Sequence, residues 1–399
     1  MNRSTPRVAL VGAAGHGTHH LRTISRLAAA GRVELAALCD PRPVLEPPAG
    51  VPVFPDHRAM LDQVRPDIAV VSTPPHTHLP IALDLVAAGA DLLLEKPPVA
   101  TLAEHETLAA ALADAGRVAQ IGFQAQGSHA VATLRHSIAE KRLGEVRGIA
   151  AAGTWIRPDS YYARSAWAGR RRHEGRPVLD GALVNPFAHT LMLGLALVTP
   201  AVPVSIELER YRCREIEVED TACLRVHFDT GPALLVAVTL CAPTAREGDI
   251  VVHGTEASAV LEYPTDRLAF TPPGAARPGG AAESPPAGRA DLLENLLDHR
   301  RDPAAVPLLV PLEATRTFTI LAEAVVAAPR PVRVPASSTR EHGTGPARTV
   351  ELTGVDAAVT AAAGRLAMFH ESGAAWARPA ITVPVGTPPS GSLRFADPS

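Results

Sequence analysis

Cysteine, aromatic residues and surplus positive charge are all scarce in this chain. The 399 residues include four cysteines, none in a CxxC pair or at the spacing of a zinc site, so we expect no metal. Aromatic residues make up 4% of the chain and the net charge is −3, so a nucleic-acid-binding surface is not expected. No run of about 18 apolar residues and no leader-like segment occurs, so we expect a cytoplasmic protein that does not bind membranes.

Apolar runs alternate with helical spacing along the first part of the chain. With short links, this alternation predicts an α/β Rossmann domain over residues 1–125, in which helices cover both faces of a parallel sheet. Ligands of such sheets bind beyond the carboxyl ends of the strands. The predicted strands are 7–11, 33–39, 67–72, 91–94 and 118–121, and the predicted helices are 19–30, 60–64, 80–88 and 102–115.

Farther along, the pattern changes to strands in succession. It predicts an α+β domain over residues 126–330, with a large, mostly antiparallel sheet for substrate binding and oligomerisation. A large apolar sheet is not expected to stay bare, so we expect it to join subunits in a homo-oligomer, either a dimer or a tetramer. Residues 331–399 are expected to form a C-terminal extension that packs on this domain or on a neighbouring subunit. The predicted strands are 146–155, 205–211, 221–228, 233–240 and 249–253, and the predicted helices are 130–141, 291–299, 313–327 and 355–369.

A glycine-rich segment joins the first predicted strand to the first helix. Gly12 and Gly17 fit the first and third positions of the dinucleotide-binding pattern G-x-G-x-x-G, and Ala14 takes the second. Backbone N–H groups at a helix N-terminus bind pyrophosphate, so we expect this loop, including Gly15 and His16, to contact a dinucleotide. The alternative is a glycine-rich turn without a ligand.

An acidic residue, Asp40, ends the second predicted strand. A carboxylate there can accept hydrogen bonds from the ribose hydroxyls, which favours NAD because a 2′-phosphate would be repelled. The neighbouring Arg42 leaves NADP open, since it could neutralise Asp40 or bind that phosphate.

Two further segments, Ser72–His78 and Glu95–Pro98, follow the third and fourth predicted strands, at the same edge of the sheet. His76 and His78 of the first segment have no cysteine or carboxylate beside them, so a metal site is not expected. In the second segment, Lys96 beside the nicotinamide could bind and polarise a substrate hydroxyl. The expected cofactor contacts are Ser72, Thr73, Pro74, His76, His78, Glu95, Lys96 and Gln124.

Three motifs occur in order: the Gly12–Gly17 loop with His20, Thr73-Pro74 with His78, and Glu95-Lys96-Pro97. In residue type, order and spacing they resemble the glucose–fructose oxidoreductase/inositol dehydrogenase (Gfo/Idh/MocA) family. The resemblance implies a two-domain enzyme that transfers hydride between NAD or NADP and a secondary alcohol or ketone of a sugar, sugar derivative or cyclitol. It also implies that Lys96 is the family's catalytic lysine.

The family carries an Asp-x-x-x-His pair on a helix of the second domain, where residues four apart share one face. The best match here is Asn185 with His189, so the resemblance makes His189 the proton acceptor. Asparagine is neutral and cannot raise the basicity of the histidine, but it can orient a substrate hydroxyl. Alternatively, Asp180 supplies the acid.

A segment rich in aromatic residues precedes this pair. Aromatic faces and a guanidinium suit stacking on, and hydrogen bonding to, a polyol, so we expect substrate contacts here. A loop that only packs over the sheet is the alternative. The residues concerned are Trp155, Tyr161, Tyr162, Arg164 and Trp167.

The substitution at Asn185 keeps two other functions open. One is a glycosidase that uses tightly held NAD as a transient oxidant. The other is a non-catalytic sensor or partner subunit that binds a dinucleotide, against which the intact Glu95-Lys96-Pro97 motif and His189 argue.

Overall fold

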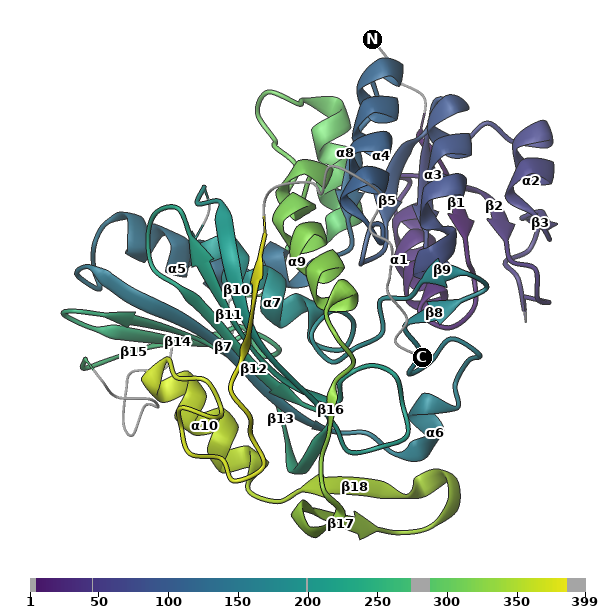
Figure 1. The fold of residues 1–399 in the computed structure, drawn as a ribbon. Helices are drawn as coiled ribbons and strands as arrows, with labels where there is room; N and C mark the ends of the chain where they lie inside the picture. Colours follow the sequence, from purple (N-terminus) through teal and green to yellow (C-terminus); the bar gives the residue numbers. More distant parts are fainter. Residues whose placement is uncertain (1–4, 45, 199, 274–287, 386–399) are drawn as a thin grey trace. The chain divides into compact units, whose positions relative to one another are not determined.

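The computed structural model describes residues 5–44, 46–198, 200–273 and 288–385, and the chain forms two compact units (Figure 1). Unit 1 consists of Met1–Phe123 and Asp291–Thr319, and unit 2 of Gln124–Ala290 and Ile320–Ser399. Residues 386–399 of the expected extension lie outside the described residues. Within the described part, no helix has both the length and the apolar character needed to cross a bilayer.

Unit 1 contains a six-stranded, all-parallel sheet in the order β3-β2-β1-β4-β5-β6, which is the Rossmann order. The strand β3, only two residues long, has no periodicity and was not predicted. The other strands lie within two residues of their predicted bounds. The strands are β1 (Arg7–Val11), β2 (Glu34–Cys39), β3 (Val53–Phe54), β4 (Ile68–Val71), β5 (Asp91–Leu94) and β6 (Ala119–Ile121), and the helices from this part of the chain are α1 (Gly17–Ala29), α2 (His57–Gln63), α3 (His78–Ala87) and α4 (Leu102–Ala115).

A later segment returns to this sheet. Residues 291–319, expected in the second domain, belong to unit 1 and include α8 (Leu292–Arg301). The fully buried Gln120 of β6 anchors them: its Oε1 accepts from Val310 N at 2.8 Å, and its Nε2 donates to Asn295 Oδ1 at 2.6 Å. Arg300 of α8 also pairs with Asp91 at the start of β5. These contacts join distant parts of the chain, so local periodicity could not reveal them.

Unit 2 is built on a nine-stranded sheet in the order β15-β14-β13-β7-β12-β11-β10-β16, with β19 also paired to β10. Most pairs are antiparallel; β7–β12 and β10–β16 are parallel. The strands β14, β15, β16 and β19 were not predicted. The strands are β7 (Val146–Ile156), β10 (Pro203–Arg212), β11 (Thr221–Phe228), β12 (Leu234–Thr239), β13 (Cys241–Gly254), β14 (Ser258–Glu262), β15 (Arg267–Thr271), β16 (Val332–Arg333) and β19 (Ile381–Pro384).

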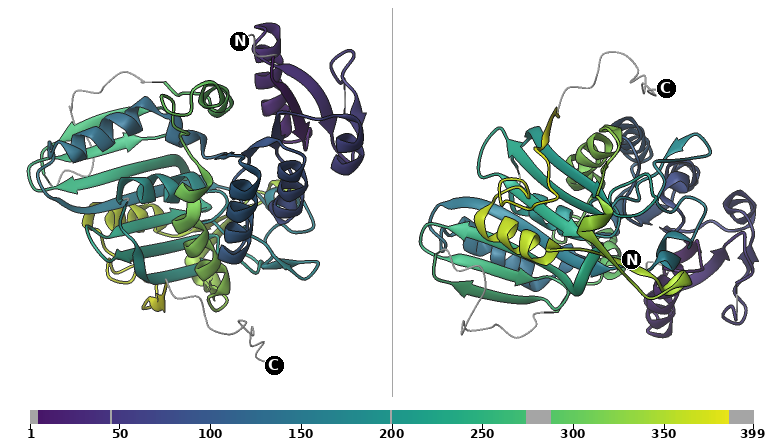
Figure 2. Two further views of the ribbon diagram at one scale, coloured as in Figure 1. Left: turned by 90° about the horizontal axis from the view of Figure 1, so that it is seen from above. Right: turned by 60° about the horizontal axis from the view of Figure 1, so that its bottom comes forward.

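Helices of the same chain cover both faces of this sheet. The helix α7 (Ala188–Val198) packs on one face of β7, β12 and β13, and α10 (Val355–Arg365) packs on the other. Alternating side chains show this division: Leu235 of β12 lies in the core with α10, whereas Leu234 contacts Gly194 of α7. Figures 1 and 2 show α10 lying across the strands.

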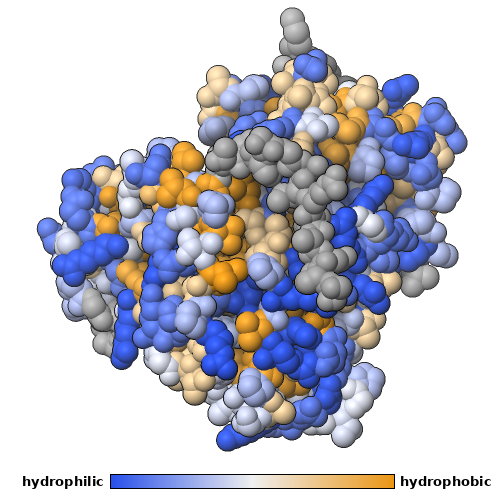
Figure 3. All heavy atoms as spheres, in the orientation of Figure 1, coloured by the Kyte–Doolittle hydropathy of each residue, from blue (hydrophilic) through white to orange (hydrophobic). Residues whose placement is uncertain are grey.

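The C-terminal extension therefore buries the sheet face for which a neighbouring subunit was expected. Its core residues include Val359, Phe369 and Trp376, packed against residues of β7, β10, β11 and β12. On the face drawn in Figure 3, hydrophobic groups of unit 2 are interspersed with hydrophilic ones. Among the described residues, the exposed large apolar side chains include Val204 of β10 and Ile381 of β19.

Candidate active site

The carboxyl ends of five neighbouring strands in unit 1 are in register. The aligned last residues are Cys39, Val11, Val71, Leu94 and Ile121. Strand register therefore brings the residues that follow them to one edge of the sheet. Those residues are Asp40, Gly12, Ser72, Glu95 and Gly122.

The glycine loop is closely packed at both ends. Gly12 has φ = +88°, and a Cβ on it would lie 2.5 Å from Ser72 O. A Cβ on Gly17, the first residue of α1, would lie 1.9 Å from Gly12 O. Only glycine fits at either position, so the chain can turn directly from β1 into α1 and present the helix N-terminus at this edge.

Asp40 is buried at the end of β2 and supports the loop. Its Oδ2 accepts from Ala14 N at 3.0 Å, and its Oδ1 accepts from Arg42 N at 3.0 Å and Arg42 Nε at 3.2 Å. Burial alone would raise the pKa of Asp40, but hydrogen bonds from Arg42 and Ala14 outweigh it and leave the pKa below its ordinary value. Asp40 is therefore an anion at the position where the sequence predicts a ribose contact, and Arg42 is paired with it.

Glu95, directly after β5, is buried against two histidines of the loop and α1. Its Oε1 lies 2.8 Å from His20 Nε2 and 3.3 Å from His16 Nε2. Burial opposes ionisation, but the hydrogen bonds from His16 and His20 lower the pKa of Glu95 well below its ordinary value. The same contact raises the pKa of His16. Glu95 thus ties the β5 loop to the start of α1.

Lys96 is half-buried beside this anion, and its backbone N–H donates to Glu95 Oε2 at 3.1 Å. The following segment is tied to the β4 loop by His78, whose Nδ1 lies 2.9 Å from Pro97 O and whose Nε2 lies 2.9 Å from Thr73 O. The His78 ring is fully buried, and burial lowers its pKa. His78 thus joins the β4 and β5 loops, and the cofactor contact expected of it from the sequence stays a prediction.

Sequence reasoning missed Gly122, which follows β6. A Cβ there would lie 2.9 Å from the Glu95 carboxyl group, so glycine makes room for the buried carboxylate. Its position directly after a predicted strand was the available signal. Thr73 accepts a hydrogen bond from Thr77 Oγ1 at 2.8 Å, which orders the β4 loop. Ser72, Pro74 and His76 lie at the carboxyl end of β4 with part of their surface exposed, and Gln124 is the first residue of unit 2.

A second polar group lies in unit 2, around the buried carboxylate of Asp180. This carboxylate accepts from Gly169 N at 2.6 Å, from Asn185 Nδ2 at 2.8 Å and from the Arg164 guanidinium. Burial raises the pKa of Asp180, although the charge of Arg164 and the hydrogen bonds oppose the shift. The structure thus brings together the asparagine at the family's acid position and the alternative acid. Gly169 was not predicted.

Cation–π contacts assemble the aromatic segment. The Arg164 guanidinium lies 3.9 Å from the ring centroid of Tyr161 and 4.8 Å from that of Trp167. Arg157 lies 4.4 Å from the Trp155 ring and 5.1 Å from Tyr161. Burial raises the pKa of Tyr161 to about 12, so its phenol stays protonated and can donate to a sugar oxygen.

The Tyr162 ring packs edge-on to Tyr161, with 5.1 Å between the ring centroids, and it also faces the Arg214 guanidinium at 5.2 Å. The helical i, i+4 pair expected at Asn185 and His189 is corrected. The helix α7 begins at Ala188, so only His189 lies on it, half-buried in its first turn. Asn185 lies in the preceding hydrogen-bonded turns, because Pro186 has no N–H to continue a helix through that point.

Two family models match the chain: "Oxidoreductase family, NAD-binding Rossmann fold" over residues 6–123 and "GFO/IDH/MocA C-terminal domain" over residues 131–260. Together they cover more than half of the chain. The chain therefore belongs to the Gfo/Idh/MocA oxidoreductase family, and unit 1 contains its NAD-binding Rossmann fold.

Among curated relatives, the provisionally named oxidoreductase subunit of a UDP-kanosamine synthase from Amycolatopsis mediterranei (strain S699) is 28% identical. The match covers 49% of this chain and 57% of that protein. D-glucoside 3-dehydrogenase of Escherichia coli (strain K12) is 28% identical over 37% of this chain and 42% of its own length. The chain thus matches about half the length of these relatives.

Among solved structures, the WlbA dehydrogenase from Bordetella pertussis, in complex with NADH and UDP-GlcNAcA, has a similar fold. The TM-score is 0.68, at 22% identity, over 81% of this chain and 95% of that one.

Proposed function

We propose that this protein is a dehydrogenase that transfers hydride between NAD and a secondary alcohol or ketone of a sugar derivative. The observation that carries the proposal is the place of Lys96 at the carboxyl edge of an NAD-binding Rossmann sheet, where its backbone N–H donates to the buried Glu95. NADP remains a second cofactor to test, because Arg42 lies at the end of β2.

The residues of unit 1 fit a dinucleotide. The glycine loop has no room for a Cβ at Gly12 or Gly17, it leads into the N-terminal end of α1, and Asp40 places a carboxylate at the end of β2 where ribose hydroxyls would bind. When bound, the nicotinamide supplies the hydride acceptor or donor. Lys96 then holds the reacting hydroxyl through its ammonium group and polarises it.

In unit 2, His189 takes the hydroxyl proton during oxidation and returns it during reduction. Asp180 stays fixed by Arg164 and Gly169, and it orients Asn185 so that the amide oxygen can accept from a substrate hydroxyl. The rings of Trp155, Tyr161 and Trp167 offer apolar faces to the sugar. The list of proposed substrate contacts is Lys96, Trp155, Tyr161, Arg164, Trp167, Asn185 and His189.

Lysine substitution tests this function. Lys96→Ala should lower kcat/KM on the order of a hundredfold or more while leaving NADH affinity within a few-fold, because the lysine acts on the substrate. The matched control is Lys141→Ala, which removes an exposed lysine paired with the surface residue Glu145. NADH formation at 340 nm with a panel of sugars, cyclitols and UDP-sugars is the assay. Unchanged turnover in Lys96→Ala would refute the mechanism.

The same panel separates the two other functions. NAD retained through purification, with sugar cleavage and no net NADH, would favour the NAD-dependent glycosidase. Tight NADH binding without turnover of any compound would favour a sensor or partner subunit. The contact between Asp180 and Asn185 argues for an enzyme. Asn185 stands where the family carries an aspartate, and it donates a hydrogen bond to the carboxylate of Asp180, so an acid still lies next to that position.

A further inference from the structure

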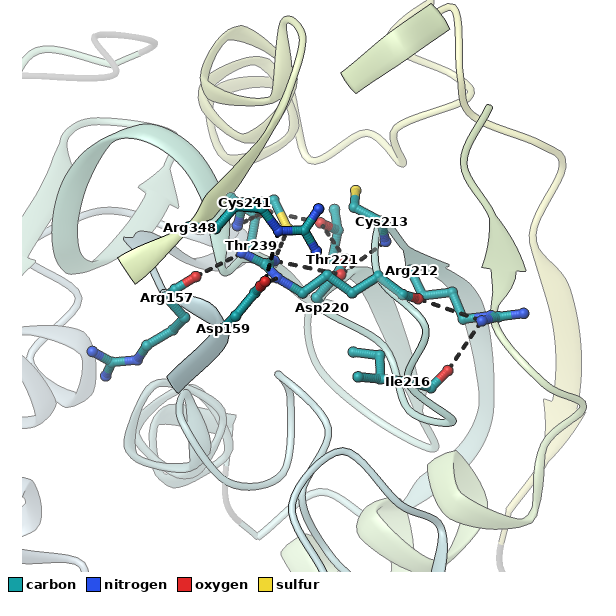
Figure 4. Close-up of polar contacts among 11 residues, drawn as sticks. Arg157, Asp159, Arg212, Cys213, Ile216, Asp220, Thr221, Thr239, Cys241 and Arg348 are labelled. Carbon is teal, nitrogen blue, oxygen red and sulfur yellow. Dashed lines mark hydrogen bonds and ion pairs between the residues drawn. The ribbon is translucent and has the colours of Figure 1, made fainter. Parts of the chain in front are cut away.

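Two cysteines from distant parts of unit 2 lie close together at one end of its sheet (Figure 4). Cys213 directly follows β10, and Cys241 is the first residue of β13. Their Sγ atoms and a carboxylate oxygen of Asp220 all lie within 4.8 Å of one another. Asp220 directly precedes β11, and it also accepts from Cys213 N at 2.8 Å. The backbone at the strand ends thus brings both thiols together at one end of the sheet.

A guanidinium is fixed against one of the two sulfurs. Arg214 Nη1 lies 3.2 Å from Cys241 Sγ, and the remaining groups of Arg214 are engaged: Nε donates to Asp159 Oδ1 at 3.1 Å and Nη2 to Arg157 O at 2.6 Å. Arg348 Nε pairs with the other oxygen of Asp159 at 2.7 Å. Arg214 therefore holds the Cys241 sulfur in place, within 4.8 Å of the Cys213 sulfur.

The two thiols differ in exposure and in surroundings. Cys241 is fully buried, whereas Cys213 has part of its surface exposed. A hydrogen bond with Cys241, together with burial, raises the pKa of the Cys213 thiol. Cys213 is therefore the sulfur that a small oxidant reaches, and it reacts slowly. Cys241, beside Arg214, is the sulfur suited to attack it.

We propose that Cys213 and Cys241 form a redox-active dithiol that hydrogen peroxide converts into a disulfide. In the first step, the Cys213 thiol and hydrogen peroxide give a sulfenic acid at Cys213 and one water. In the second step, Cys241 Sγ attacks the Cys213 sulfur, the S–S bond forms, and the sulfenic oxygen leaves with the thiol proton as a second water. Two electrons pass from the sulfurs to the peroxide.

A metal ion is a less suitable occupant of this cluster, although its donor atoms are those of a metal site. Arg214 already places a positive charge beside these donor atoms. It lies 3.2 Å from Cys241 Sγ and 4.0 Å from Asp220 Oδ2. A divalent cation bound to these atoms would meet that guanidinium at close range, and the like charges repel each other.

The test is thiol counting and peptide mapping on the reduced full-length chain before and after treatment with hydrogen peroxide. The chain has four cysteines, so the number of free thiols should fall from four to two. The intact mass should fall by two hydrogen atoms, and a peptide containing Cys213 should be linked to one containing Cys241. Dithiothreitol should restore all four thiols.

Single substitutions supply the controls. Cys213→Ser and Cys241→Ser should each abolish the link, and the former replaces a partly exposed residue, so it tests the pair even if the buried substitution disturbs folding. Cys39→Ser and Cys223→Ser, which change buried cysteines outside the pair, should keep it. The proposal is overturned if the folded chain keeps four thiols, if Cys213 advances to sulfinic acid without a link, or if the purified chain carries stoichiometric zinc.

Discussion

Glu95 is a buried anion that depends on its imidazole neighbours. Its folded-state pKa lies below the ordinary value because of His16 and His20, so the ionised form stabilises the fold above the unfolded pKa of about 4.3. That contribution is lost as the pH falls through the lower, folded-state pKa. Glu95→Gln should therefore reduce the free energy of unfolding at neutral pH by about 1–3 kcal/mol, and the difference from wild type should shrink on acidification.

Urea unfolding followed from neutral pH to below about pH 4 measures this difference. Glu34→Gln is the control, because Glu34 is exposed at the start of β2 and pairs only weakly with Arg7. A difference between Glu95→Gln and wild type that stays constant with pH would show that Glu95 is not ionised in the folded protein.

The pair of Asp180 and Asn185 allows a test in which stability should change with pH in the opposite direction. Asn185→Asp would place a second carboxylate against Asp180, where Asn185 Nδ2 now donates at 2.8 Å, and two such carboxylates share one proton. The shared proton raises the folded-state pKa of one carboxyl group above its unfolded value. The stability is then fully present below the unfolded pKa and is lost as the pH rises through the folded-state pKa. Asn185→Asp should therefore match wild type in acid and be about 1–3 kcal/mol less stable at neutral pH. Asn185→Ala should show a loss that changes little with pH.

At the scale of elements, a strand or contact could be predicted when the strand was long enough to show a pattern and the contact followed from the local sequence. Strands of four or more residues in unit 1, such as β1 and β5, carry an apolar run bounded by turn residues, and their bounds were predicted exactly from the sequence. The two-residue β3 has no such pattern. Asp40, Ser72 and Glu95 could be placed at one edge because parallel strands share their direction. The contact between Asp180 and Asn185 was not predicted from the sequence, which offered Asp180 only as an alternative acid, because the contact depends on turns rather than on a helix.

The returning helix α8 is the element that local patterns could not place in unit 1, and Gln120 is its fully buried polar anchor. Gln120→Ala would leave the buried Val310 N–H and Asn295 side chain without their β6 partner, which should cost about 1–3 kcal/mol. Hydrogen exchange should quicken most within α8 and residues 302–310. The control Gln63→Ala removes an exposed glutamine at the end of α2 and should change neither quantity. Uniformly faster exchange throughout unit 1 would contradict a local anchoring role.

At the scale of the whole molecule, the C-terminal extension changes the reasoning about assembly. A subunit partner was expected because a large sheet face should not stay bare. In the structure, α10 and the residues after it fill that face, with Trp376 edge-on to Tyr211 at 5.0 Å and to Phe369 at 5.2 Å. The indole also donates to Thr353 O at 3.2 Å. The chain itself therefore supplies the cover, which removes the physical reason for a dimer through this face.

A substitution at Trp376 tests whether the C-terminal extension covers the sheet face and keeps a second subunit off it. Trp376→Ala removes a large buried ring and should lower the free energy of unfolding by about 3–5 kcal/mol. Loosening of the cover then exposes the apolar face of β10, β11 and β12, so the variant should associate as its concentration rises, whereas the unaltered chain should keep a monomer mass in light scattering. Trp167→Ala, the same substitution at a half-buried residue of unit 2, should neither associate nor lose comparable stability. A dimer of the unaltered chain that dissociates when Trp376 is replaced would instead show that the extension builds the subunit interface, since a cover that excludes a partner cannot also be needed to hold one.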